Sequence, residues 1–349
     1  MIPFLYNLVR PILFLFEPEK AHYIGFKCLK IFYQLAQKTN TSLFFSCNKV
    51  KNDSIQLMGF HFPHRVGLAA GLDKNAEYLT ELFALGFAFV EVGTVTPLAQ
   101  PGNAKPRLFR LKSSQALINR LGFNNHGISN LLNNIKKSNY LGILGINIGK
   151  NASTPMENAI NDYIFGLEAV YKTADYITIN ISSPNTKNLR QLQEYNALGN
   201  LLQALNIKRN ELAIKFKKQV PLVLKIAPDL THQQVLEIAY SIKKNNIDGI
   251  IATNTTLQRC GVENHPLAIE NGGLSGAPVL AISNKIIKQF REALGPDVVI
   301  IGAGGIMNYA DAQSKIDAGA DLIQIYTGLI YRGPSLIQEC QLIQKNALN

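Results

Sequence analysis

Cysteine is scarce in this chain, and its cysteines lie far apart. The chain of 349 residues has four, at positions Cys28, Cys47, Cys260 and Cys340, and they form no CxxC pair. Closely spaced cysteines are the usual sign of structural zinc sites and of disulfide frameworks. We therefore expect no metal site and no disulfide-stapled fold, and a reducing interior fits the chain best.

Long apolar runs are also absent. No stretch of 18 apolar residues occurs, so no membrane-spanning helix is expected. The apolar start lacks the charged first region and the small-residue cleavage site of a secretory signal. We expect this segment to remain in the mature protein.

Acidic residues are the minority among the charges. Aspartate and glutamate number 24 against 35 lysines and arginines, which gives a formal net charge of +11. Such a surface attracts nucleic acid, acidic lipid or anionic substrates, although a generally basic surface would look the same. The chain has no appended RNA-binding domain and no basic aromatic cluster, so nucleic acid is not an expected partner.

Most of the chain repeats one pattern, and its apolar fraction of 47% predicts a globular protein. From about residue 64, short apolar runs, turns rich in glycine or asparagine, and amphipathic helical stretches alternate. Eight such repeats predict an α/β fold, a (β/α)8 TIM barrel with a parallel sheet. An open sheet would show GxGxxG after its first strand, where this chain has AAGLDK. The expected strands are Val66–Ala70, Phe89–Gly93, Ile143–Ile148, Tyr176–Ile181, Leu222–Ile226, Gly249–Thr253, Val298–Gly302 and Leu322–Tyr326.

Helices are expected between these strands, and a hairpin before them. Thr231 suits an N-cap and Pro155 a first turn. Ser54–Phe62 is predicted to form a small hairpin around Met58–Gly59 that closes the barrel floor. The expected helices include Asn75–Leu85, Pro155–Lys172, Thr231–Asn245, Ala281–Leu294 and Tyr309–Ala318.

The first 40 residues differ in character. Phe4–Phe16 is apolar and is expected to kink or break near Pro11. In Lys20–Lys38 a polar face of lysines and glutamine lies opposite a broad apolar face, which predicts a second helix joined to the first at Glu17–Pro18. The pair either packs on the barrel as plain structure or forms an interfacial hairpin, with lysines toward anionic head groups. The apolar face comprises Ile24, Cys28, Ile31, Phe32 and Leu35.

Polar residues follow the expected strands at the end where this fold places reacting groups. Together these residues would line the open end of the barrel with amides, hydroxyls and two lysines. Such a lining suits a planar heterocycle with an anionic group. One asparagine at a strand end is more often a turn former, so the prediction depends on the whole set. These groups are Ala70–Lys74, Gly93-Thr94, Asn147–Gly149, Asn180–Asn185, Lys225 and Thr253–Thr255.

Glycine-rich turns follow the last strands. Gly302–Ile306 and Tyr326–Gly328, with Gly273–Gly276, suit phosphate binding through backbone N–H groups. Lys225 either neutralises charge developing on a reduced cofactor or pairs with a structural carboxylate. Ser183 is the candidate base, although serine is a poor base and an SSPN turn is often only a turn.

Taken together, these segments resemble the dihydroorotate dehydrogenase family, in order and over essentially the whole chain. The matching segments are AAGLDK (69–74), EVGTVTP (91–97), PGN (101–103), KPRLFR (105–110), INRLGFNN (118–125), GINIGKN (145–151), NISSPNT (180–186), KIAPDL (225–230), ATNTT (252–256), GGLSG (272–276) and GAGGI (302–306).

The resemblance implies one bound FMN and a site for dihydroorotate and orotate. It makes Ser183 the base that takes a proton from C5 of (S)-dihydroorotate while hydride leaves C6 for flavin N5, a step of pyrimidine biosynthesis. The implied FMN residues are Ala70, Gly71, Leu72, Asp73, Lys74, Thr94, Asn147, Asn180, Lys225, Thr253, Gly276, Gly305, Tyr326 and Thr327. The implied substrate residues are Lys74, Asn119, Arg120, Leu121, Gly122, Phe123, Asn180, Asn185, Asn254 and Thr255.

The resemblance also implies the quinone-reducing, membrane-associated class. Soluble relatives carry cysteine at the position of Ser183 and begin almost directly with the barrel, whereas FEPEKAH (16–22) resembles the helical quinone tunnel of this class. Residues 1–45 are then the quinone- and membrane-binding segment, and 46–349 the FMN-binding barrel. His22 either belongs to the tunnel or makes only a local hydrogen bond.

We expect a bacterial enzyme that is peripheral on the cytoplasmic side of the inner membrane, touches anionic lipid, reduces a membrane quinone and is a monomer. Alternatives are a soluble fumarate- or NAD-linked dihydroorotate dehydrogenase, a non-redox phosphate-binding TIM barrel and an RNA-modifying flavoenzyme.

Overall fold

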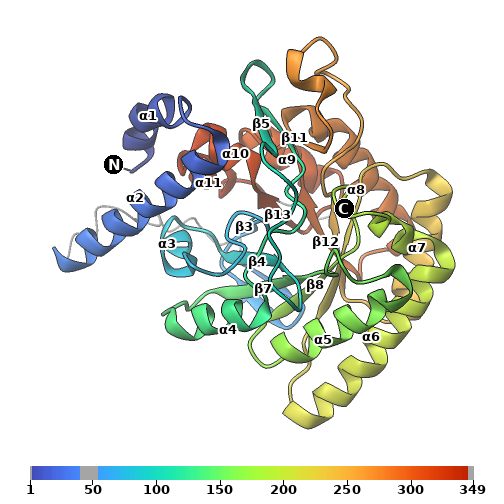
Figure 1. The fold of residues 1–349 in the computed structure, drawn as a ribbon. Coiled ribbons are helices and arrows are strands. Elements are labelled where there is room, and N and C mark those ends of the chain that lie inside the picture. Colours follow the sequence, from blue (N-terminus) through green and yellow to red (C-terminus); the bar gives the residue numbers. More distant parts are fainter. Residues whose placement is uncertain (1, 40–53, 345–349) are drawn as a thin grey trace.

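The computed structural model describes residues 2–39 and 54–344, and its centre is a closed barrel of eight parallel strands wrapped by helices (Figure 1). The barrel strands are β3 (Val66–Leu68), β4 (Phe89–Val95), β7 (Ile143–Ile148), β8 (Tyr176–Asn180), β9 (Leu222–Ile226), β10 (Gly249–Ala252), β12 (Val299–Ala303) and β13 (Leu322–Ile325). They close in chain order, with β13 pairing back to β3. The predicted TIM barrel and its eight strands are confirmed. The expected division between residues 45 and 46 lies outside the described residues, as does Cys47.

The helices match the expected ones to within a few residues, but two of them start late. The helix expected from Pro155 begins at Ala159, after a 3₁₀ turn at Met156–Asn158. The helix expected from Asn75 begins only at Leu79, because Ala76 has a φ of 58° and the Asp73 carboxylate accepts hydrogen bonds from the amides of Glu77 and Tyr78. The helices are α1 (Ile2–Leu13), α2 (Pro18–Lys38), α3 (Leu79–Ala84), α4 (Ile128–Lys137), α5 (Ala159–Val170), α6 (Tyr195–Phe216), α7 (His232–Lys244), α8 (Leu280–Leu294), α9 (Tyr309–Asp317), α10 (Thr327–Arg332) and α11 (Ser335–Cys340).

Side chains fill the barrel at one end, and the predicted hairpin covers that end. Phe89 and Tyr176 are fully buried inside the barrel. The hairpin of β1 (Ile55–Leu57) and β2 (Phe60–Phe62) packs on this cluster, with the Phe62 and Phe89 rings 5.4 Å apart. The floor is therefore closed, and only the opposite end of the barrel can admit a ligand.

A second, antiparallel sheet stands beside the open end of the barrel, as Figure 1 shows. It consists of β5 (Leu108–Leu111), β6 (Ala116–Asn119) and β11 (Gly273–Gly276). Sequence periodicity did not predict this sheet, because four-residue strands leave little pattern and β6 and β11 are far apart in the chain. Gly273–Gly276, which was expected as a turn, forms strand β11 instead, because it pairs with β6. The sheet matters because β6 ends at Asn119, beside the barrel mouth.

The helical pair α1 and α2 lies against one side of the barrel (Figure 1). The expected joint is confirmed: Glu17 caps α2 by accepting hydrogen bonds from the amides of Glu19 and Lys20. The break expected near Pro11 falls instead at Leu13, since α1 continues through the proline. Tyr6 Oη donates to the carbonyl of Ile330, which fastens the pair to the barrel. No helix in the described ranges is long and apolar enough to cross a membrane.

The N-cap expected at Thr231 is present in a full capping box. Thr231 Oγ1 accepts from the amide of Gln234, and the Gln234 side chain accepts from the amide of Thr231. We expect Thr231→Ala to lower the free energy of unfolding by about 1 kcal/mol, because a first-turn amide loses its partner. Urea denaturation should show this loss, and Thr231→Ser should be close to wild type. An unchanged urea midpoint in Thr231→Ala would mean that water accepts the hydrogen bond of the Gln234 amide equally well.

Candidate active site

The open end of the barrel holds a polar cavity that brings together most residues predicted for the site. The space between its walls, with the open solvent at its mouth included, is about 1050 Å³. Of the predicted residues, those in its wall are Ala70, Gly71, Lys74, Thr94, Asn119, Leu121, Gly122, Phe123, Asn180, Ser183, Asn185, Lys225, Thr253, Asn254, Thr255, Gly276, Gly305, Tyr326 and Thr327.

Four predicted residues lie outside that wall. Leu72 faces a second cavity, described below. Asp73 is buried and holds the turn before α3. Asn147 lies one layer below, where its Oδ1 accepts a hydrogen bond from Asn180 Nδ2 at 3.2 Å. The Arg120 side chain points away and pairs with Glu270 at 2.7 Å.

The turns after β11 and β12 bring backbone close to one end of the cavity. Gly276 and Gly305 both have positive φ, 99° and 87°. A Cβ added at Gly305 would lie 2.5 Å from Leu280 Cα, so only glycine allows this close approach. Thr327 begins α10 opposite them, and its hydroxyl donates to Ser275 Oγ at 2.9 Å. Bare glycine backbone of this kind suits the oxygens of a phosphate.

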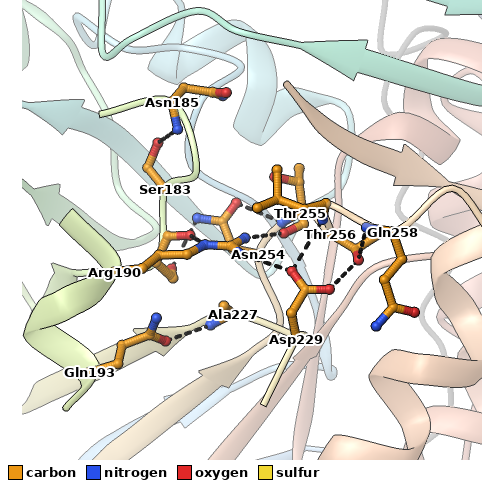
Figure 2. Close-up of polar contacts among 12 residues, drawn as sticks. Ser183, Asn185, Arg190, Gln193, Ala227, Asp229, Asn254, Thr255, Thr256 and Gln258 are labelled. Atoms are coloured by element: carbon orange, nitrogen blue, oxygen red, sulfur yellow. Dashed lines mark hydrogen bonds and ion pairs between the residues drawn. The ribbon is translucent and has the colours of Figure 1, made fainter. Parts of the chain in front are cut away.

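Ser183 lies in the loop after β8, and Arg190 joins that loop to the loops after β9 and β10 (Figure 2). Ser183 is buried, and its Oγ accepts a hydrogen bond from the amide of Asn185 at 3.2 Å. Arg190 donates to the carbonyls of Ser182 and Thr255 and pairs with Asp229 at 2.7 Å. The candidate base and the loop that carries Asn254 and Thr255 are thus held as one unit.

The floor of the cavity carries two opposite charges. Glu91 is fully buried, and its carboxylate accepts hydrogen bonds from Asn147, Tyr176, Thr178 and Gln324 at 2.8 to 3.1 Å. Lys225 lies in the cavity wall, where burial lowers the pKa of its ammonium group and the negative charge of Glu91 raises it. Glu91 is thus a structural carboxylate whose charge acts on Lys225, and the lysine still lines the cavity. That Lys225 neutralises charge on a reduced cofactor stays a prediction.

Some buried polar atoms in this wall have no partner among the described residues. They are the hydroxyl oxygens of Thr253 and Thr255 and Oε1 of Gln324. Buried polar atoms are nearly always hydrogen-bonded in a functional state. Together with the glycine turns and Lys225, they fit a flat, polar heterocycle that carries a phosphate.

A second cavity lies between the helical pair and the barrel. It is mostly apolar and encloses about 1330 Å³ out to its opening. The His22 ring faces this space, where apolar surroundings, with help from the positive charge of Lys74, lower its pKa to about 4 and keep it neutral at pH 7. The wall includes Leu5, Val9 and Leu13 of α1, Gly25, Phe26 and Leu29 of α2, and Leu72, Leu82 and Ile330 of the barrel.

The two cavities share one lining residue. The Tyr326 ring lines both, and a Cβ added at Gly71 would lie 3.2 Å from that ring. A compound in the apolar cavity would therefore come close to a cofactor in the barrel mouth. It would not contact the residues predicted to bind substrate, which line the polar cavity.

Comparisons with known proteins agree with this geometry. The sequence profile of the family described as dihydroorotate dehydrogenase matches residues 54–345. This chain belongs to the dihydroorotate dehydrogenase family. It is 54% identical over 336 residues, 96% of both chains, to the dihydroorotate dehydrogenase (quinone) of Chromobacterium violaceum. It is 52% identical over 356 residues, 98% of both chains, to the protein of the same name from Albidiferax ferrireducens.

A solved structure of the family has the same fold. The DHODH of Eimeria tenella in complex with ferulenol superposes with a TM-score of 0.84 at 38% identity, covering 93% of this chain and 89% of that one. The family and the flavin-dependent enzyme class predicted from the sequence are confirmed.

Three residues of this site were not predicted from the sequence: the buried Glu91 and the ion-paired Arg190 and Asp229. Glu91 interrupts the apolar run of β4, and a charge in the middle of a buried strand is a signal that could have been used. Arg190 and Asp229 carry no such signal, because they are 39 positions apart and meet only in the folded chain.

Proposed function

We infer that this chain oxidises dihydroorotate to orotate, with a flavin in the barrel mouth and a quinone as electron acceptor. The observation that carries this function is the pair of cavities, one polar and one apolar, that share Tyr326. Family membership supplies the reaction, and the curated relatives are named as the quinone-dependent enzyme. The reaction belongs to pyrimidine biosynthesis.

The flavin is FMN in this proposal, because the glycine turns at Gly276 and Gly305 suit one phosphate group. Gly276, Gly305 and Thr327 take the phosphate, and Lys225 and Thr253 face the ring system. When bound, FMN supplies a two-electron acceptor for hydride. The remaining FMN residues of the proposal are Ala70, Gly71, Leu72, Asp73, Lys74, Thr94, Asn147, Asn180 and Tyr326, of which Leu72, Asp73 and Asn147 act from behind the cavity wall.

The substrate lies between the flavin and the loop of Ser183. Lys74, whose pKa burial lowers to about 8, supplies positive charge for the carboxylate of dihydroorotate. Asn119, Asn185 and Asn254 present amides to the pyrimidine ring, with the backbone of residues 119–123, Asn180 and Thr255 completing the contacts. Arg120 contributes through its backbone, since its side chain pairs with Glu270.

Ser183 acts as the base at C5: its Oγ takes the C5 proton while its own hydroxyl proton passes to a water or a neighbouring hydroxyl. The amide of Asn185 donates to Ser183 Oγ, which fixes the hydroxyl orientation and stabilises negative charge that develops on it. Arg190, through its ion pair with Asp229 and its hydrogen bond to the carbonyl of Thr255, holds this loop against the loop of Asn254 and Thr255 (Figure 2).

The apolar cavity takes the quinone, and the helical pair docks on a membrane surface. Residues 1–45 form this unit in our proposal, and residues 46–349 the FMN-binding barrel. Several apolar side chains of the pair are well exposed, namely Leu8, Ile12, Leu15, Tyr23, Ile31 and Leu35. The nearby lysines of α2 suit anionic lipid. This favours a monomer held peripherally on the cytoplasmic face of a bacterial inner membrane.

A steady-state assay with different electron acceptors tests the proposal. The purified protein should be yellow, and with dihydroorotate as donor it should reduce a soluble ubiquinone analogue at least about 100-fold faster than fumarate or NAD. A faster reaction with fumarate or NAD would reject the quinone, and a colourless, inactive preparation would reject the flavoenzyme. Mass spectrometry of the released flavin identifies it as FMN or not.

A further inference from the structure

A buried lysine behind the glycine turn after β12 has no role in the reaction described so far. Lys315 of α9 is fully buried. Its Nζ donates to Ser283 Oγ and to Asn284 Oδ1, both at 2.9 Å and both neutral acceptors. Among the described residues no carboxylate lies within ion-pair distance of it, and the nearby Asp311 carboxylate accepts instead from the amide of Met307 at 2.9 Å. The protein thus buries a lysine amino group whose hydrogen-bond partners are both neutral.

Such a group is costly in a folded protein. Burial lowers the pKa of Lys315 to about 7, and the negative charge of Asp311 only partly opposes that shift. A buried charge is usually retained where a partner offsets its desolvation. Since the described residues offer Lys315 no paired carboxylate, a bound ligand is the remaining source of an anionic partner.

The hydrogen bonds of Lys315 lead to the cofactor side of the barrel. Ser283 Oγ, which accepts from Lys315, donates in turn to the carbonyl of Ala303 at 2.7 Å. The peptide that contains this carbonyl continues into Gly304 and Gly305, which line the cavity. The Lys315 stem packs under the same strand, since a Cβ added at Gly302 would lie 3.1 Å from Lys315 Cδ.

These hydrogen bonds all donate in the same direction, from Lys315 to Ser283 and from Ser283 to the carbonyl of Ala303. Because the ammonium group donates to Ser283, the serine hydrogen is free to point at Ala303 O, and that bond polarises the peptide so that the Gly304 N–H becomes a better donor. Lys315 therefore places positive potential behind the turn and fixes the turn's orientation at the same time.

We propose that Lys315 is a positioning residue for the cofactor phosphate, acting through Ser283 on the Ala303–Gly305 turn. The proposal rests on the assignment of FMN to the barrel mouth. It predicts that Lys315 contributes to the preference of the protein for FMN over riboflavin, which has the same ring system without the phosphate.

An exchange experiment on the holoenzyme tests this. The protein is equilibrated with mixtures of FMN and riboflavin, separated from free flavin, and its bound flavins are quantified by chromatography. Lys315→Met, which keeps the stem and removes the charge, should lower the FMN-to-riboflavin affinity ratio about tenfold, the effect of removing a buried charge close to an anion. Ser283→Ala should lower it in the same direction by less.

Ile316→Ala is the matched control, because Ile316 is a buried neighbour in α9 whose loss weakens packing without touching the hydrogen-bond chain. Its affinity ratio should equal that of wild type even where its thermal stability falls. If Lys315→Met and Ser283→Ala also keep the wild-type ratio, the positioning role is wrong and Lys315 is structural. If wild type itself shows no preference for FMN, the cofactor assignment fails instead.

Discussion

Ser183→Ala should reduce the rate of flavin reduction by dihydroorotate by about 10² to 10⁴, the usual contribution of a general base. Ser183 is the buried hydroxyl in the cavity wall whose orientation is set by a backbone donor, the amide of Asn185. Removing it leaves the glycine turns, Lys225 and the amides in place. Stopped-flow spectroscopy should therefore show slow bleaching of the flavin, with orotate affinity and flavin content close to wild type.

The second half-reaction serves as the internal control. Reoxidation of the chemically reduced Ser183→Ala protein by a quinone analogue should keep its normal rate, since the apolar cavity is untouched. Ser183→Cys should recover part of the lost rate and shift the pH profile to lower pH, because a thiol ionises near pH 8.5 in the absence of perturbation. A wild-type rate of flavin reduction in Ser183→Ala would mean that another group removes the C5 proton of dihydroorotate.

Gly25→Leu should lower the rate of quinone reduction by more than about tenfold while leaving flavin reduction by dihydroorotate unchanged. Gly25 lies in α2 and lines the apolar cavity. A Cβ at this position would meet nothing closer than Leu13 Cδ1 at 3.9 Å, so the leucine side chain has room to grow into the cavity. Leucine also has a higher helix propensity than glycine, so the helix itself is not weakened.

A glycine in another helix provides the control for this substitution. Gly199 lies in α6, away from both cavities, and a Cβ there would meet no atom within 4 Å. Gly199→Leu should leave both half-reactions at the wild-type rate. Normal quinone reduction in Gly25→Leu would mean that the acceptor reaches the flavin by a route other than the apolar cavity.

Local sequence predicted the elements that local chemistry specifies. The alternation of apolar runs and helical stretches fixes eight strands because side-chain direction along a strand or helix depends only on near neighbours. The hairpin at Met58–Gly59 and the cap at Thr231 follow in the same way from turn and capping preferences. Placing the polar strand ends in one cavity needed one further rule, that parallel strands end at the same side of a barrel.

Local sequence failed where a distant residue decides the outcome. The start of α3 depends on the Asp73 carboxylate, which takes the amides that a longer helix would have used. The strand β11 exists because β6 pairs with it from more than 150 positions away. Neither partner can be read from the pattern of the segment itself.

The sequence by itself thus determined a barrel with a polar mouth, glycine turns and a serine in a turn after the fourth strand. Only the tertiary structure decided which groups face one another: Arg190 with Asp229, Glu91 with Gln324, Lys315 with Ser283, and Tyr326 between two cavities. The physical reason is that periodicity and turn chemistry act over a few residues, whereas these contacts join residues 32 to 233 positions apart.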